Sequence, residues 1–173
     1  MLVRPLQLAE VSIGGAHNPP TFADARIPVY GFLILAGEEV ILVDTGVGEG
    51  NDYVDQNFKP TRQDLATALA GCDVTPADVT TLVNSHLHFD HCGGNCILQD
   101  DGREARPAFP NASYYVNAGE LEYARRPDLR SRPSYLAHTW EPLERTGQLV
   151  PCTDVQTVCQ GVELMPAAGH TLH

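Results

Sequence analysis

The sequence has 173 residues, the usual size of one domain and enough for a sizeable hydrophobic core. Its net charge of −11 argues against a nucleic-acid partner, because phosphate binding needs clustered Lys and Arg. No apolar run reaches the length of a membrane span, and the N-terminus lacks the pattern of a signal peptide. Five cysteines without a dense framework fit reduced thiols, so we expect one cytoplasmic domain over residues 1–173, without membrane partners.

The first part of the chain predicts a strand followed by a hairpin. Arg4–Ile13 alternates loosely between apolar and polar residues, as a strand does. Residues 14–26 are rich in Gly, Pro, Asn and Asp and predict a loop, in which His17 would be a solvated side chain. Ile27–Leu35 and Val40–Val43 are apolar runs joined by a short polar segment, which predicts the hairpin.

An acidic residue, Asp44, ends the second hairpin strand and is followed by Gly46 and Gly48. A carboxylate at a strand end before a glycine-rich turn suits a loop beside a metal site, where it would orient a ligand. A turn-capping Asp is the alternative interpretation.

The next segment predicts helices and a buried strand. Residues 49–60 are polar and rich in turn-forming residues, as a pocket rim is. Thr61 is predicted to cap a helix that ends at Gly71, and Thr75 to begin a very short second helix. Val79–Val83 is an apolar run typical of a buried strand. This order of strand, hairpin, helix and strand favours a layered α/β architecture.

Directly after this strand, four metal-binding side chains occur within six residues: His86, His88, Asp90 and His91. Imidazole nitrogens and carboxylate oxygens are ligands that Zn²⁺ accepts. His86 and His88 can point the same way from an extended segment, whereas Asp90 and His91 are adjacent and their side chains diverge. The spacing therefore indicates two neighbouring metal positions rather than one.

The remaining chain supplies a further candidate ligand. We expect a surface excursion at Ile97–Pro110, and secondary structure in five later segments: strands at Ala112–Val116, Val155–Cys159 and Val162–Met165, and helices at Ala118–Arg126 and Ser134–Leu149. The last strand leads into Gly169 and His170. An imidazole just after a strand and a glycine would complete a site of three histidines with an open position for water. An ordinary loop histidine is the alternative.

The stretch from His86 to His91 resembles the metallo-β-lactamase superfamily, whose signature is His-x-His-x-Asp-His. The wording Ser-His-Leu-His-Phe-Asp-His-x-Gly-Gly-Asn is especially similar to the N-acyl homoserine lactonase-like branch, and the resemblance runs from about Tyr30 to the last residue. It implies an α/β fold, the metallo-β-lactamase-like αβ/βα sandwich, of which this chain supplies the first half plus the start of the second half. It also implies that Asp44 lies under the metals and supports their ligands, and that His170 is the third histidine of the first metal.

The resemblance also implies ligands that this sequence does not contain. In the family, a later Asp bridges the two metals and a still later His completes the second site. We therefore expect the chain to be a C-terminally truncated or fragmentary version of the domain. A smaller self-contained domain and a homodimer that covers the open half are the alternatives.

For the complete enzyme, the resemblance implies a metal-dependent hydrolase that acts on an ester-like bond of a small molecule, with a lactone as the first candidate. Two zinc ions, or iron or manganese, would activate water, and Asp90 would bind the second metal and act as general acid. A glyoxalase-type thioester hydrolase, a β-lactamase-like hydrolase and a one-iron persulfide dioxygenase remain as alternatives. The non-enzyme alternative is an inactive metal-binding fragment.

Overall fold

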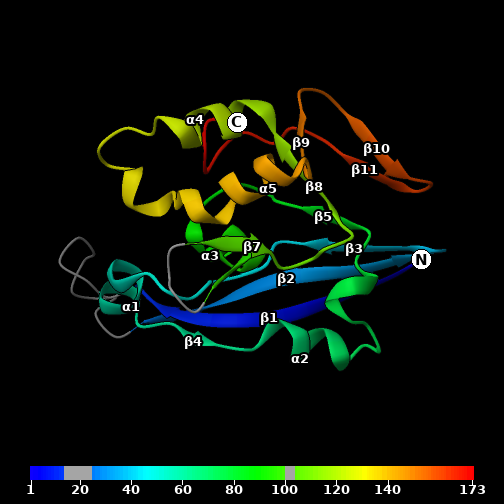
Figure 1. Ribbon diagram of the computed structural model, residues 1–173, viewed down its shortest axis with the longest axis horizontal. Coiled ribbons are helices and arrows are strands. Elements are labelled where there is room, and N and C mark those ends of the chain that lie inside the picture. Colours follow the sequence, from blue (N-terminus) through cyan, green and yellow to red (C-terminus); the bar gives the residue numbers. More distant parts are fainter. Residues whose placement is uncertain (14–24, 100–103) are drawn as a thin grey trace.

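The computed structural model describes residues 1–13, 25–99 and 104–173, and the loop expected at residues 14–26, with His17, lies almost wholly outside them. Its centre is a seven-stranded sheet with the order β4-β1-β2-β3-β5-β8-β9 (Figure 1). The strands on the β4 side are antiparallel, and those from β3 to β9 are parallel. The strands are β1 (Leu2–Ser12), β2 (Arg26–Ala36), β3 (Glu39–Val43), β4 (Thr61–Arg62), β5 (Thr81–Val83), β8 (Ser113–Asn117) and β9 (Leu149–Cys152).

The sheet confirms the strands and the hairpin expected from apolar patterning. In β2, Val29 and Leu33 are buried, whereas Tyr30 and Phe32 on the other face are exposed, as the two-residue period of a strand requires. β5 is buried along its whole length, which explains its continuous apolar run. The parallel strands end at the same edge of the sheet, so the residues that follow β3 and β5 lie side by side.

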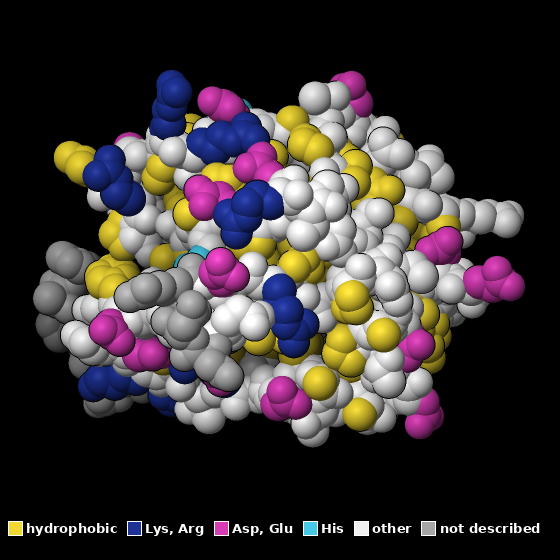
Figure 2. Space-filling model, viewed as in Figure 1, with side chains coloured by type: hydrophobic (Ala, Val, Ile, Leu, Met, Phe, Trp, Pro, Cys, Tyr) yellow, Lys and Arg dark blue, Asp and Glu magenta, His cyan; other side chains and the backbone are white. Residues whose placement is uncertain are grey.

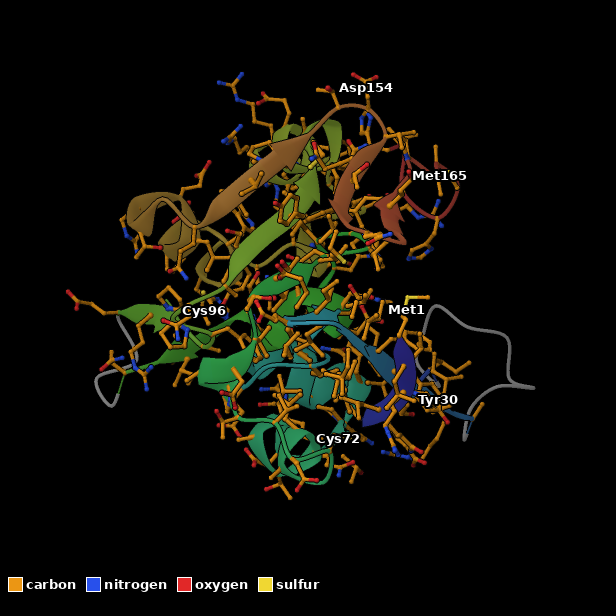
Figure 3. All side chains as sticks on the ribbon, turned by 90° about the vertical axis from the view of Figure 1, so that its right-hand side faces the viewer. Met1, Tyr30, Cys72, Cys96, Asp154 and Met165 are labelled. Carbon is orange, nitrogen blue, oxygen red and sulfur yellow. The ribbon has the colours of Figure 1, made fainter. Side chains whose placement is uncertain are left out.

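Helices cover one face of this sheet. They are α1 (Asp52–Phe58), α2 (Leu65–Ala70), α3 (Phe89–Cys92), α4 (Ala118–Arg125) and α5 (Glu141–Thr146), with the 3₁₀ turns η2 (Pro76–Asp78), η3 (Gly93–Asn95), η4 (Arg132–Ser134) and η5 (Ala137–Thr139). Leu69 of α2 and Leu143 of α5 share one core with Leu33 and Leu82 of the sheet. On the opposite face, Tyr30 and Phe32 stay exposed, and Figure 3 shows Tyr30 at the surface. None of the helices in the described residues is long and apolar enough to cross a membrane.

The helix predicted after Thr61 begins later than expected. Thr61 lies in the edge strand β4, where it pairs with β1. The N-cap is Asp64, whose carboxylate accepts hydrogen bonds from the backbone N–H and the hydroxyl of Thr67. The predicted end at Gly71 and the short turn that begins after Thr75 are confirmed.

The single helix predicted over Ser134–Leu149 is wrong. The segment forms two 3₁₀ turns, the short helix α5 and the start of β9. Pro142 lies in the first turn of α5, and Gly147 ends that helix in the left-handed conformation with φ of 74°. Pro142 and Gly147 are therefore the start and stop signals of α5.

Three further segments add short elements. Residues 49–60, predicted as a rim, contain α1, which Asn51 caps. The excursion at residues 97–110 contains two strands, β6 (Cys96–Leu98) and β7 (Ala105–Pro107), while residues 100–103 lie outside the described part. The hairpin of β10 (Gln156–Cys159) and β11 (Val162–Leu164) confirms the two strands predicted at Val155–Cys159 and Val162–Met165. The structure pairs none of the five cysteines in a disulfide.

Basic and acidic side chains alternate on the molecular face shown in Figure 2. Near α4 and α5, Arg125 forms ion pairs with both Glu122 and Glu144. The charge of Arg125 is thus partly neutralised by two neighbouring carboxylates.

Candidate metal centre

Two loops at the carboxyl edge of the parallel strands build the site. One follows β3 and begins with Asp44, and the other follows β5 over residues 84–95. The Asp44 N–H donates to the Val83 carbonyl at 2.9 Å, and the Thr45 N–H to the His91 carbonyl at 2.7 Å. A Cβ atom added to Gly93 would lie 2.1 Å from the Gly48 nitrogen, so only glycine permits this approach of the two backbones. Gly48 and Gly93 therefore allow the backbones of the two loops to pack directly against each other.

A buried amide pair closes the base of the second loop. Asn95 donates to the side-chain oxygen of Asn84 at 2.9 Å, and Asn84 donates back at 3.2 Å. The Thr45 hydroxyl adds a third hydrogen bond, to Asn95 Oδ1 at 3.0 Å. Because both Asn side chains are buried, these bonds satisfy groups that would otherwise destabilise the loop.

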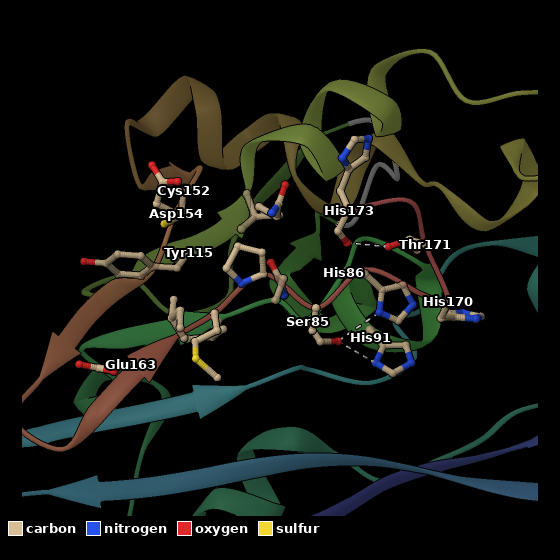
Figure 4. Close-up of a pocket in the computed structure, with 18 residues that line it drawn as sticks. Ser85, His86, His91, Tyr115, Cys152, Asp154, Glu163, His170, Thr171 and His173 are labelled. Atoms are coloured by element: carbon tan, nitrogen blue, oxygen red, sulfur yellow. Dashed lines mark hydrogen bonds between the residues drawn. The ribbon is translucent and has the colours of Figure 1, made fainter.

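The structure brings together three of the predicted ligands, His86, His88 and His170. One nitrogen from each lies within 4.8 Å of the others, although His170 is far away in the sequence. His88 Nδ1 and His170 Nε2 are 3.2 Å apart. Figure 4 shows His86 and His170 beside a common cavity, together with Ser85 and His91. The three side chains predicted as ligands of the first metal are thus close together, and their binding of a metal stays a prediction.

The protonation states of His86 and His88 favour binding of a metal cation. Burial and the neighbouring imidazoles of His91, His88 and His170 lower the pKa of His86 to about 2. Burial, followed by the imidazole of His170, also lowers the pKa of His88. Both rings are therefore neutral near pH 7, with lone pairs available for a metal.

Two geometric observations test whether zinc fits these residues. His86 Nε2 is buried and has no hydrogen-bond partner among the described residues. At Zn–N lengths of about 2.0–2.1 Å, two nitrogens of a tetrahedral site lie about 3.3 Å apart. The 3.2 Å between His88 Nδ1 and His170 Nε2 is close to that value. The donor set and its spacing therefore fit Zn²⁺.

Asp44 connects to this cluster through hydrogen bonds. Its carboxylate accepts from the Ser85 N–H at 2.8 Å, from the Ser85 hydroxyl at 2.7 Å and from His91 Nδ1 at 2.8 Å. Burial lowers the pKa of His91, but the hydrogen bond to Asp44 and the charges of Asp44 and Asp90 outweigh it and raise the pKa above its ordinary value. Asp44 is placed to orient histidines, and its supporting role stays a prediction.

Asp90 and His91, the predicted ligands of a second metal, lie outside the cluster of three histidines. His91 Nε2 and Asp90 Oδ2 are 3.6 Å apart, too far for a hydrogen bond. The His91 ring centroid is nevertheless only 4.0 Å from that of His86. His91 Nε2 and Asp90 Oδ2, the two candidate metal-binding atoms, thus lie close to each other beside the first cluster. This placement is compatible with the predicted second metal position.

Sequence reasoning missed three residues around the ligands: Ser85, Glu120 and Tyr135. The Glu120 side chain is fully buried and accepts from the Leu87 N–H and from the Tyr135 hydroxyl, both at 3.0 Å. The Tyr135 ring stands edge-on to His88, with centroids 4.8 Å apart. The Tyr135 side chain is buried, and no spacing rule in the sequence indicated its contact with His88.

A cavity of about 510 Å³ adjoins the histidines. It is lined by His86, His91 and His170 and by residues of β11 and the segment that follows it, including Leu164 and Met165. This volume is in the range of small-molecule sites.

Comparison with known proteins places the fold in a family. The family model of the metallo-beta-lactamase superfamily matches residues 25–158. The chain belongs to this superfamily. An N-acyl homoserine lactonase from Bacillus cereus is 28% identical over 159 residues, which cover 84% of this chain and 56% of that protein. The chain spans 56% to 60% of the length of the curated Bacillus relatives that it matches.

Solved structures agree with the family. A probable metal-dependent hydrolase from Staphylococcus aureus has a TM-score of 0.82 at 20% identity, over 99% of this chain and 65% of the other. An N-acyl homoserine lactone hydrolase with N-hexanoyl-L-homoserine at its catalytic metal centre has a TM-score of 0.69 at 24% identity, over 98% and 66%. These likenesses confirm the predicted α/β metallo-β-lactamase-like fold.

Proposed function

We propose that this chain provides the metal site of a hydrolase that opens a lactone ring or a similar ester. The observation that carries the proposal is the convergence of His86, His88 and His170 beside a small-molecule cavity. The lactonase names of the similar curated proteins favour a lactone among ester-like substrates.

In this proposal, His86, His88 and His170 hold the first zinc ion, and Asp90 and His91 contribute to a second. When bound, zinc supplies a Lewis acid for the carbonyl oxygen and a water that is nucleophilic near pH 7. His86 and His88 suit this task, because their lowered pKa values keep protons from competing with the metal.

Asp90 is proposed to move the proton that the reaction needs. The attacking water gives up a proton and the departing alkoxide must gain one, and a carboxylate beside the site can accept the first proton and deliver it to the alkoxide. The Asp90 side chain is 26% exposed and can reach solvent and substrate, whereas that of Asp44 is only 8% exposed and already accepts three hydrogen bonds. Of these two carboxyl groups, Asp90 is therefore the better proton donor.

The test is lactone hydrolysis by the 173-residue chain after zinc loading, with metal content and identity measured on the same sample. Proton release from an N-acyl homoserine lactone is compared with release from a thioester and from a β-lactam. We expect zinc-dependent opening of the lactone, which chelation or His88→Ala abolishes and Asp90→Asn slows strongly. A chain that binds zinc but opens lactone no faster than free zinc would refute the proposal and favour an inactive metal-binding domain. Full turnover by Asp90→Asn would refute its proton-transfer role.

A further inference from the structure

Building on the metal site proposed above, we propose that Ser85 is a positioning residue that fixes the tautomer of His86. Its hydroxyl would hold the His86 proton on Nδ1, so that Nε2 presents its lone pair to the metal. The neutral imidazole has only one N–H, and a ring nitrogen that carries the proton cannot be a ligand. The tautomer of a buried histidine therefore decides whether it can bind a metal.

The first step concerns the single proton of the Ser85 hydroxyl. The carboxylate of Asp44 can only accept hydrogen bonds. Its Oδ2 atom is 2.7 Å from Ser85 Oγ, the shortest contact that this hydroxyl makes with the residues around it. The serine proton therefore points to Asp44, and the oxygen is left as an acceptor.

The second step concerns His86. Its Nδ1 atom is 3.1 Å from Ser85 Oγ, as the dashed line in Figure 4 marks. Because the hydroxyl proton is already used, this contact is a hydrogen bond only if His86 Nδ1 carries the proton. Nε2 then has a free lone pair, and it is the atom that is buried without a partner.

His91 does not compete with His86 for the hydrogen bond to the Ser85 hydroxyl oxygen. Its Nδ1 lies 3.4 Å from Ser85 Oγ but only 2.8 Å from Asp44 Oδ2, so its proton is donated to Asp44. One carboxylate thus orients two histidines, His91 directly and His86 through the Ser85 hydroxyl. Hydrogen-bond partners of metal-ligating histidines typically contribute 10–100-fold to metal affinity.

The test uses Ser85→Ala, with Ser85→Thr to restore the hydroxyl. Ser113→Ala is a control at the opposite end of the parallel strands. Ser85 is exposed and its N–H bond to Asp44 is made by the backbone, so Ser85→Ala is expected to fold. Two properties are measured: the tautomer of His86 in the metal-free protein, from two-bond ¹H–¹⁵N correlation spectra, and the zinc dissociation constant, by chelator competition.

We expect a protonated Nδ1 on His86 in the wild type, and a 10–100-fold weaker zinc complex after Ser85→Ala. Ser85→Thr and Ser113→Ala should bind zinc like the wild type. A proton on Nε2 in the wild type, or an unchanged zinc affinity after Ser85→Ala, would overturn the proposal. Neither measurement involves lactone, so a failure of the proposed hydrolase activity is distinguishable from a failure of this role of Ser85.

Discussion

Replacing Asp44 by Asn tests how far one carboxylate organises the site. Asp44 has φ of 59°, a left-handed conformation that Asn tolerates but Ala does not. Asp44→Asn therefore changes the charge and one acceptor atom without adding backbone strain. Asp73→Asn is a matched control, because Asp73 has the same φ of 59° but is exposed.

The magnitude follows from the hydrogen bonds of Asp44 Oδ2. This atom accepts from the Ser85 hydroxyl at 2.7 Å and from His91 Nδ1 at 2.8 Å. An amide NH₂ at that place accepts neither, and hydrogen bonds to charged groups contribute about 1.5–3 kcal/mol each. Because the serine hydroxyl can turn and accept from the new amide, we expect Asp44→Asn to lower the free energy of unfolding by about 2–4 kcal/mol.

The loss should depend on pH in a definite direction. The pKa of His91 is raised in the folded protein, so the stabilisation from its charged form is fully present below the unfolded value and is lost as the pH rises through the folded value. Urea unfolding of the metal-free protein should therefore show a larger effect of Asp44→Asn near pH 6 than near pH 8.5. The NMR titration of His91 should move to lower pH in the variant. An effect no larger than that of Asp73→Asn, with an unchanged His91 titration, would refute this account of Asp44.

Three other outcomes follow from the geometry. His170→Ala should lower the zinc bound per chain, measured by metal analysis, whereas His138→Ala should not, because His138 lies outside the cluster. Gly93→Ala should destabilise the protein in urea unfolding by clearly more than Gly169→Ala, since the first Cβ would meet the Gly48 backbone at 2.1 Å and the second would meet nothing within 4 Å; equal losses would contradict the close packing of the loops. In the metal-free protein, His88→Gln should lose less stability than the wild type between pH 7 and pH 5, by at most about 1.4 kcal/mol per pH unit, because the lowered pKa of His88 leaves that proton to the unfolded chain; equal slopes in urea titrations would refute this.

The sequence was sufficient to predict most of the sheet and the local part of the site. The apolar run at Ile27–Leu35 and the apolar run before Asn84 were the signals, and both follow from burial in the sheet. The candidate ligands at residues 86–91 were visible because side chains that can bind metals are dense there. The approach of His170 to His88 could not be derived from spacing, because it depends on the path of the whole intervening chain.

The errors have a common physical origin in ambiguous local signals. Both Thr61 and Asp64 are good N-cap residues, and the choice is made by β1, which recruits Thr61 into an edge strand. Ser85 was missed because a serine carries no signal of its own. Its importance comes from the distances to Asp44 and His86, which only the fold sets.

Two carboxyl groups bind the backbone of residues 85–88, the segment that carries the candidate ligands His86 and His88. Asp44, at the end of β3, accepts from the Ser85 N–H, and Glu120, on α4, accepts from the Leu87 N–H. In an extended segment, alternate side chains point in the same direction, so fixing the amides of residues 85 and 87 also fixes the direction of His86 and His88. Both anchors bind backbone groups and are therefore independent of the side chain at position 85. Because Ser85→Ala leaves this frame intact, a loss of zinc affinity in that variant would report the hydroxyl alone.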